Sequence, residues 1–551
     1  MSAAPLEIPS RLARPRGSIL AVLGGGLIVL ALAAPFLSLA HSAAQGSEIL
    51  PHLLAYVLPQ ALRETALLLA GVAIVVLGVG TGTAWLVAAY DFPGRRLLEW
   101  ALVLPLAVPT YIIAYAYLDL LHPIGPVQTG LRALFGIANP RDLPFPEVRS
   151  LPVCAALLGF VLYPYVYLPT RALFLMQGAN VLEVARTLGA GPARVFFRVA
   201  LPLARPAVAI GATLALLEAL NDIGASEFLG VRTLTVSIYT TWVNRSDLPG
   251  ASQIALAMLA VVGAFILLEG WARRHSRQTA SARAPARRPL RGLAAAAAFA
   301  AGFLPVAIGF LAPAGHLVVE SAKRIAFAGL SPRLLDETLN TVLLSGAATL
   351  LTVAIGLALA IGVRFNPSER ARALLRMAGL GYAVPGTVLA VSLLAPLSAL
   401  DAGLATLVEL VTGLSMGTLV LGSSVALIYA YCVRFMAIAV GSSDAGLAKI
   451  PPNLDAASRV LGHGKLSTVW RIHLPLAAPA IASGALLVFV DCMKELPATL
   501  LLRPLNVETL ATHLYGEAAR GTYEDGAVAA LIIVAVGMLP LILVSRLQTR
   551  R

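Results

Sequence analysis

Long apolar stretches alternate with short polar segments along the whole chain. Each stretch is long enough to cross the hydrocarbon core of a bilayer as a helix of about 20 residues. Because lipid offers the backbone no hydrogen-bond partners, the pattern predicts an all-α polytopic membrane protein with about twelve spans. The expected spans lie near residues 18–40, 62–90, 98–121, 151–177, 202–222, 252–272, 293–318, 338–363, 374–399, 415–440, 476–493 and 526–545.

A polar break divides these spans into two groups. Residues 273–292 are rich in Arg, Ala and Pro and show no apolar periodicity. Such a composition is typical of a linker. We therefore expect a first half over 1–272 and a second half over 293–551, joined by a cytoplasmic linker.

The composition agrees with a membrane protein. Hydrophobic residues make up 58% of the chain and charged residues 13%, whereas soluble domains carry about 25% charged residues. The net charge of +13 could indicate nucleic acid, but the charges fall in short runs between apolar stretches. Lys and Arg concentrate on alternate loops, which predicts that both termini lie in the cytoplasm, and no nucleic-acid partner is expected.

A segment of the first half recurs in the second half at an offset of 273 residues. Residues 186–212 read RTLGAGPARVFFRVALPLARPAVAIGA, and residues 459–485 read RVLGHGKLSTVWRIHLPLAAPAIASGA. Fourteen of these 27 positions are identical. The copies share orientation because each follows an even number of spans. Two parallel halves with a pathway between them are therefore expected.

Each copy lies on an expected cytoplasmic loop, near residues 179–202 and 450–475. The first loop opens with Asn180 and Glu183, which can form a reciprocal helix cap, and its short helix should end at Gly189. In the second copy Ala456 stands at the Glu position and the acid is Asp455. Losing the cap costs about 1 kcal/mol of local helix stability, so the sequence leaves open whether the two loops contribute equally.

These loops resemble a known motif. Glu183-Val184-Ala185, followed by Gly189 and by Leu201-Pro202, is similar to the EAA loop of the permeases of binding-protein-dependent ABC importers. The second copy keeps Gly462 and Leu474-Pro475. The resemblance implies two tandem six-helix type I repeats whose coupling helices dock on two copies of a separate ATPase subunit. The residues implied in coupling are Glu183, Ala185, Arg186, Gly189, Asp455, Ala456, Ala457, Arg459 and Gly462.

Two further segments resemble one subgroup of this family. Residues 494–510 and 221–230 are similar to the fused permeases of ferric-iron importers. This implies translocation of ferric iron delivered by a periplasmic binding protein, although relatives of the same build carry thiamine or phosphonates. An ion-coupled secondary transporter is the alternative of another class, and it would need acidic residues near the middle of the bilayer. A membrane scaffold without transport is a third alternative.

Ionisable residues near span ends are the candidates for a pathway or gate, because charges within a membrane are costly. Glu218 matches Asp491 across the repeat, and Asp222 matches Glu495. Their carboxylates could bind a hard cation or form a gate with Lys494. The simpler interpretation is a helix-end cap or an interfacial residue.

Other residues carry weaker signals. The tyrosines at 111, 115, 117, 163, 165 and 167 could bind ferric iron, but Tyr at span ends is typical of an interfacial belt. We expect His41, His52, His122, His316 and His513 to be solvated loop residues, and the sequence assigns no metal ligand. The chain contains no GxxxxGK[ST] loop, so we expect no ATPase activity, no catalytic residue and no cofactor.

Overall fold

A computed structural model gives the architecture of the chain and describes residues 26, 34–176, 184–185, 187–273, 287–414 and 417–549. Within these residues nine helices are long and apolar enough to cross a membrane, or eleven when two bent helix pairs each count as one span. Most of the first expected span, 18–40, lies outside the described residues. The chain is an all-α polytopic membrane protein, as the sequence predicts.

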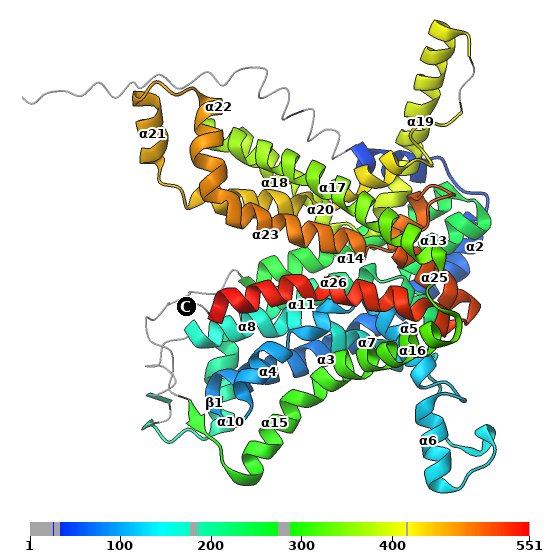
Figure 1. Cartoon of the computed structure of the whole chain (residues 1–551), viewed down its shortest axis with the longest axis vertical. Helices are drawn as coiled ribbons and strands as arrows, with labels where there is room; N and C mark the ends of the chain where they lie inside the picture. The colour runs from blue at the N-terminus through cyan, green and yellow to red at the C-terminus, as the bar shows by residue number, and fades with distance from the viewer. Residues whose placement is uncertain are drawn as a thin grey trace, which may run out of the picture. The chain divides into compact units, whose positions relative to one another are not determined.

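The first half contains the following elements, labelled in Figure 1: α2 (Leu50–His52), η1 (Leu53–Val57), α3 (Leu58–Ala89), β1 (Tyr90–Asp91), α4 (Arg95–Ala101), η2 (Leu104–Ala107), α5 (Thr110–Leu120), α6 (Pro126–Phe135), η3 (Pro140–Asp142), α7 (Leu151–Leu162), α8 (Pro164–Met176), α10 (Pro192–Val195), η4 (Phe196–Ala200), α11 (Leu201–Asn221), α12 (Gly224–Phe228), α13 (Leu234–Arg245) and α14 (Leu248–Arg273).

The second half contains β2 (Arg288–Pro289), α15 (Gly292–Val306), η5 (Ala307–Leu311), α16 (Ala312–Ala328), α17 (Pro332–Phe365), α18 (Glu369–Ala378), η6 (Leu380–Ala383), α19 (Gly386–Thr412), α20 (Ser424–Ala448), α21 (Pro452–Val460), α22 (Lys465–Thr468), η7 (Val469–His473), α23 (Leu474–Met493), α24 (Pro497–Leu502), α25 (Leu510–Arg520) and α26 (Tyr523–Thr549).

The internal repeat extends to individual elements. Each of α10, η4 and α11 has a counterpart that begins 273 residues later, in α22, η7 and α23. In both copies a single turn of π-helix joins the short helix to the long one, so that one continuous helix crosses the expected loop end. The structure has this arrangement in both halves.

Three expected spans differ from the simple pattern. The fourth is a mildly bent pair, in which α7 meets α8 at an angle of 41°. The third is a bent pair, in which α4 and η2 meet α5 at an angle of 92°. The bend falls at Val108, whose extended backbone follows from the α-disfavouring effect of Pro109. In the second half, α19 continues through residues 400–412, where a loop was expected, because Leu and Val continue the helix until Gly413 ends it with a positive φ of 69°.

The chain forms two units that do not coincide with the two halves. One unit comprises Met1–Pro35, Thr349–Tyr382 and Tyr431–Val488. The other comprises Phe36–Ala348, Ala383–Ala430 and Phe489–Arg551. We call them the smaller and the larger unit. We call the repeated loops near 179–202 and 450–475 the first and second candidate coupling loops. The second belongs to the smaller unit, and the first and all pathway candidates belong to the larger unit.

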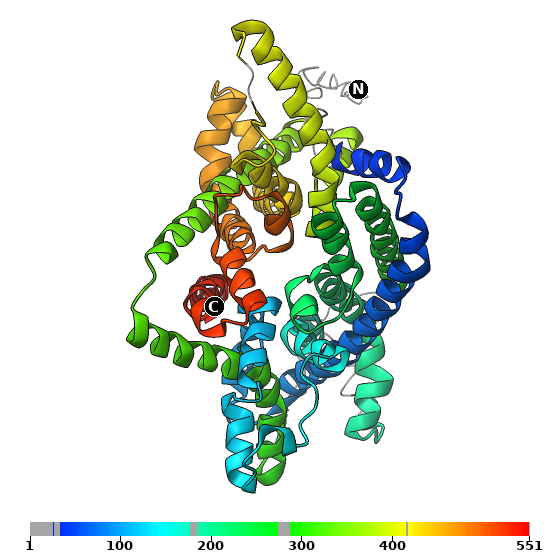
Figure 2. The ribbon, with the colours of Figure 1, turned by 90° about the vertical axis from the view of Figure 1, so that its right-hand side faces the viewer.

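The larger unit combines elements of both halves. Helix α3 packs against α7 and α8, and α11 packs against α8 and α3. From the second half, α16 packs against α5 and α26, and α26 also packs against α25 (Figure 2). The first candidate span of the second half, Gly292–Ala328, ends in α16 and therefore contacts the first half. Strands β1 and β2 form a short parallel pair in which the end of the expected linker lies against the segment after α3.

Candidate coupling loops and pathway residues

The first candidate coupling loop ends its short helix with a left-handed glycine. Gly189 has a φ of +80°. The backbone N–H of Leu188 donates to Val184 O at 3.0 Å, and that of Ala190 donates to Ala185 O at 3.1 Å. These bonds satisfy carbonyls that the end of a helix leaves open, as the expected C′ glycine requires. Two predicted coupling residues, Glu183 and Arg186, lie outside the described residues.

The second candidate coupling loop repeats this geometry. Gly462 has a φ of +78°. The N–H of Leu461 donates to Ala457 O at 3.0 Å, and that of His463 donates to Ser458 O at 3.0 Å. Both bonds are the first-loop bonds displaced by 273 residues. The two copies therefore share a backbone conformation as well as a sequence.

Matched apolar side chains are exposed on the two loops. Leu188 and its counterpart Leu461 are 81% and 74% exposed. Ala456, Ala457 and Arg459 on α21 are exposed as well. Because these residues lie outside the candidate membrane spans, lipid does not explain their exposure. Because this exposure recurs at equivalent positions of the two loops, both leucines are candidates for contacts with a partner.

The acid of the second loop holds α21 to its surroundings. As expected, α21 has no side-chain cap. Instead, Asp455 pairs with Arg364 Nε at 3.0 Å and with His473 Nε2 at 2.7 Å. Arg364 also donates to Leu447 O at 2.6 Å and to Ile450 O at 3.0 Å. We call Asp455, Arg364 and His473 the loop-two network, and all of it belongs to the smaller unit.

The charge of Asp455 is stabilised by this network. Burial alone would raise its pKa, but the hydrogen bonds from His473 and Arg364 outweigh burial and lower the pKa below its usual range. At the 273 offset, Arg364 and His473 correspond to Asp91 and Ala200, which cannot make the same bonds. Sequence reasoning did not find Arg364 or His473, because they lie far from Asp455 along the chain.

Two pathway candidates are buried caps of short helices. Asp222 accepts hydrogen bonds from Ser226 N at 3.0 Å and from the Thr110 hydroxyl. Glu495 accepts from Ala498 N and from Thr499 N, both at 3.0 Å. Asp222 and Glu495 are only 6% and 5% exposed. Their geometry is that of the helix-end cap that the sequence left open.

The other candidates differ in their surroundings. Asp491, on the last turn of α23, forms an ion pair of 2.8 Å with Lys494, which directly follows the helix three positions later. Glu218 is half-buried on α11. The structure therefore brings Lys494 to one of the predicted acids.

Residues from the two halves meet beside the caps. The Asn221 side-chain oxygen accepts a hydrogen bond of 2.7 Å from Gly386 N, at the start of α19. A Cβ added to Gly224 would lie 2.5 Å from Tyr111 Cβ and 3.1 Å from Leu496 Cδ2. We call Tyr111, Asn221, Asp222, Gly224 and Glu495 the central cluster. The sequence singled out Tyr111, Asp222 and Glu495 as candidates, but it did not show that they meet, because the cluster joins distant segments of the chain.

The expectation of an interfacial tyrosine belt was wrong for several residues. Tyr115, Tyr163 and Tyr167 are at most 1% exposed, and Tyr111 is 4% exposed. The Tyr115 hydroxyl donates to Tyr523 O, and the Tyr117 hydroxyl donates to Ile308 O at 2.8 Å. These tyrosines are packed inside the larger unit, where two of them bond to the second half.

The expectation of solvated histidines was wrong for His316 and His513. His316 is buried and lies 2.8 Å from Asp119. His513 Nδ1 lies 3.1 Å from Glu337. A hydrogen bond to Glu337 raises the pKa of His513. Both histidines belong to helices that turn them toward a carboxylate, which residue spacing alone did not reveal.

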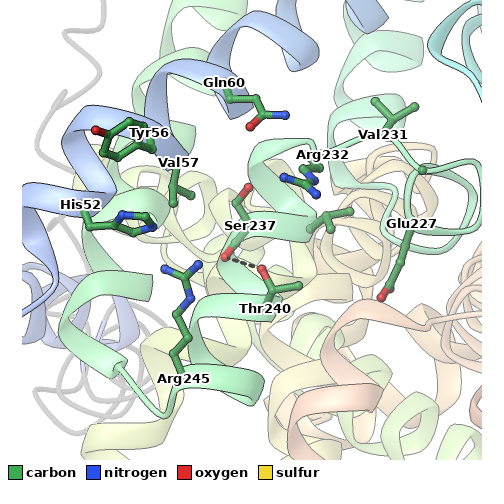
Figure 3. A pocket seen from close by; sticks show the side chains of 12 residues that line it. His52, Tyr56, Val57, Gln60, Glu227, Val231, Arg232, Ser237, Thr240 and Arg245 are labelled. Carbon is green, nitrogen blue, oxygen red and sulfur yellow. Dashed lines mark hydrogen bonds between the residues drawn. The ribbon is translucent and has the colours of Figure 1, made fainter.

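A cavity of about 610 Å³ opens near α13 (Figure 3). Arg232, Arg245 and His52 line it together with Ser237, and one carboxylate, Glu227, lines it as well. Among the described residues, no carboxylate forms an ion pair with either arginine side chain. A cavity with two guanidinium groups and hydroxyl donors has the chemistry to hold a small anion.

The family is decided by the comparison with known proteins. The model of the family "Binding-protein-dependent transport system inner membrane component" matches residues 76–279 and 352–551, once in each half. The chain belongs to this family. It is a multi-pass inner-membrane permease, the transport component of a system that includes a substrate-binding protein and an ATPase.

The relatives that are similar to this chain are named for different substrates. The Fe(3+)-transport system permease protein FbpB 2 of Haemophilus influenzae is 23% identical over 494 residues, which are 88% of this chain and 89% of the relative. The ferric transport system permease protein FbpB of Actinobacillus pleuropneumoniae is 24% identical over 461 residues, 79% of this chain and 63% of the relative. The molybdenum transport system permease protein ModB of Escherichia coli is 32% identical over 206 residues, 36% of this chain and 85% of the relative.

Proposed function

We propose that this permease translocates ferric iron, which a periplasmic binding protein delivers, and that two copies of a separate ATPase subunit drive it. The observation that carries the ATPase docking is the matched pair of coupling loops, with equal backbone geometry and exposed Leu188 and Leu461. Ferric iron is supported by the similarity to ferric permeases over most of the chain. The halves are 1–272 and 293–551, and both termini lie in the cytoplasm.

In the proposed cycle, ATP binding draws the two ATPase subunits together. Each subunit moves the coupling helix that it holds, and the continuous helices that follow, α10 to α11 and α22 to α23, pass the motion to the spans. The binding protein supplies affinity, so the permease needs no tight substrate site. The central cluster is where α12 and α24 can open or close the route, because its acids hold the ends of these short helices.

Reconstituted transport tests this proposal. Proteoliposomes that contain the permease and its ATPase should take up labelled ferric iron only with ATP and the loaded binding protein. Leu188→Ser combined with Leu461→Ser should release the ATPase while the permease remains in the membrane. Leu505→Ser is the matched control, because Leu505 is 96% exposed but lies outside both loops. Uptake driven by an ion gradient without ATP would instead support a secondary transporter.

An oxyanion is the second candidate substrate. The cavity lined by Arg232 and Arg245 favours it, as does the similarity of part of the chain to a molybdenum permease. Ferric, molybdate, phosphonate and thiamine binding proteins can be compared by the ATPase activity that each stimulates in its loaded form. Stimulation by the molybdate protein, lost in Arg232→Gln, would overturn ferric iron.

A further inference from the structure

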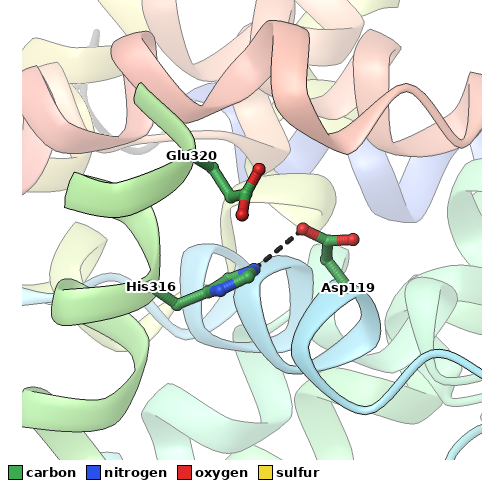
Figure 4. A group of neighbouring side chains, drawn as sticks. All are labelled: Asp119, His316 and Glu320. Carbon is green, nitrogen blue, oxygen red and sulfur yellow. Dashed lines mark hydrogen bonds and ion pairs between the residues drawn. The ribbon is translucent and has the colours of Figure 1, made fainter. Parts of the chain in front are cut away.

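A cluster of three metal-ligating side chains lies where α5 of the first half packs against α16 of the second half. Asp119 stands on the last turn of α5, and His316 and Glu320 stand one turn apart on α16 (Figure 4). The four-residue spacing places His316 and Glu320 on one helix face. We propose that these three residues bind a divalent first-row transition-metal ion that ties the two helices together.

The positions of the donor atoms suit such an ion. One donor atom from each side chain lies within 4.8 Å of the other two, and His316 Nε2 lies 2.8 Å from Asp119 Oδ2. Metal–ligand bonds of about 2.0–2.2 Å place neighbouring ligands of a tetrahedral ion about 3.3 Å apart. Small side-chain rotations therefore bring the three donors to one ion and leave a fourth position for water.

The donor types select the class of ion. One imidazole nitrogen with two carboxylate oxygens suits zinc, manganese or ferrous iron. Calcium and magnesium prefer sites made of oxygen alone. The ligand set is therefore that of a divalent transition metal.

The charges of the cluster favour the binding of a cation. Two carboxylates face one imidazole, and the His316 side chain is only 6% exposed. Lys323 pairs with Glu320 at 2.8 Å, but the Lys323 side chain is 67% exposed, so this ion pair is weak and easily displaced. The nearby Arg324 is held by Asp525 of α26 at 2.5 Å. A bound ion would thus replace a surface lysine as the partner of Glu320.

The consequence concerns the assembly of the permease and is independent of its cargo. The three ligands come from helices of different halves, and His316 lies 197 positions after Asp119 in the sequence. An ion that binds only the packed helices stabilises their contact by mass action. The site would then fix α16 against α5 through the transport cycle.

Metal titration of the purified permease in complex with its ATPase tests the site. After treatment with a chelator, the complex is titrated with Zn²⁺, and both bound zinc and the temperature of unfolding are measured. We expect one ion per permease chain and a higher unfolding temperature. Asp119→Asn, His316→Gln and Glu320→Gln should each weaken binding by at least the 10–100-fold that is typical even for residues around a metal site.

Two further variants separate the site from a general loss of folding. His513→Gln removes a histidine that also pairs with one carboxylate, Glu337, and it should leave zinc binding unchanged. Lys323→Ala removes the competing cation and should tighten binding. Absence of a stoichiometric ion in the wild type, equal binding by a variant that lacks all three ligands, or no gain in Lys323→Ala would overturn the proposal.

Discussion

Single side chains distinguish the two candidate coupling loops. Asp455 pairs with Arg364 and His473, and the first half has Asp91 and Ala200 in place of the last two residues. The two loops share the backbone conformation, but only the second loop has the ion pairs of Asp455 with Arg364 and His473. The second loop is therefore the place where a single substitution should act on one half alone.

Asp455→Asn should destabilise the second loop. The side chain keeps its size but loses the charge that pairs with Arg364 and His473, and hydrogen bonds to charged groups are worth about 1.5–3 kcal/mol. We expect a lower unfolding temperature and weaker stimulation of the ATPase by loaded binding protein. Asp444→Asn, at an exposed position of α20, is the control. Equal behaviour of the two variants would remove Asp455 from the coupling role.

The pair of His513 and Glu337 predicts a pH dependence of stability. Its hydrogen bond to Glu337 raises the pKa of His513 in the folded protein. The stabilisation is therefore complete below the unfolded pKa of about 6.5 and is lost as the pH rises through the higher folded pKa. Between about pH 6 and 9, the unfolding temperature should fall more in the wild type than in His513→Gln. His122→Gln, at an exposed position, should follow the wild type.

At the scale of elements, the end of each candidate coupling helix depends on one glycine. Gly189 and Gly462 have φ values of +80° and +78°, and a Cβ at either position would meet no atom within 4 Å. A larger residue at either position is therefore not crowded by neighbouring atoms. It is unfavourable because its backbone would have to adopt the left-handed conformation. This separates a conformational effect from a packing effect in the same loop.

Gly189→Ala and Gly462→Ala should each cost about 1–2 kcal/mol of local stability, because alanine disfavours the left-handed region. We expect reduced uptake and reduced ATPase association, with membrane insertion unchanged. Gly→Asn at the same positions is the matched control, because asparagine tolerates this conformation better. An asparagine variant as impaired as the alanine variant would contradict the conformational explanation.

At the scale of the whole molecule, helices of the second half pack against helices of the first half. Besides the contact of α16 with α5, α26 approaches η2 so closely that a Cβ on Gly537 would lie 2.4 Å from Ala107 O. Only glycine permits this approach, because the obstacle is a backbone atom. The larger unit thus depends on close backbone packing between the halves.

Gly537→Ala should force α26 away from η2 and destabilise the larger unit by about 1–3 kcal/mol, the usual cost of overpacking. Gly263→Ala, on α14, is the control because its Cβ would meet no atom within 4 Å. That control should be neutral or slightly stabilising, since alanine is the better helix former. Thermal unfolding of both variants in detergent distinguishes the two outcomes, and equal shifts would contradict the packing argument.

The sequence predicted the all-α fold and the duplication because apolar length and internal identity are local signals. It also predicted the left-handed glycines, whose spacing from the short helices is fixed within the loop. It did not predict the 92° bend, the helix over 400–412, or the partners of Asp455 and His316. Those features depend on which helices pack together and in what rotation, and no periodicity along the chain encodes that.

The unequal support of the two candidate coupling loops has a consequence for how such a chain changes over time. In a transporter made from two identical subunits, every mutation in the docking loop is made twice. Here the two loops are encoded by different parts of one gene, so each can change independently. The second half can therefore acquire Arg364 and His473 as partners for its loop while the first half does not. If two copies of one ATPase subunit dock as proposed, each copy meets a loop with different supporting side chains, and exchanging the loops between the halves would reveal which loop the ATPase needs.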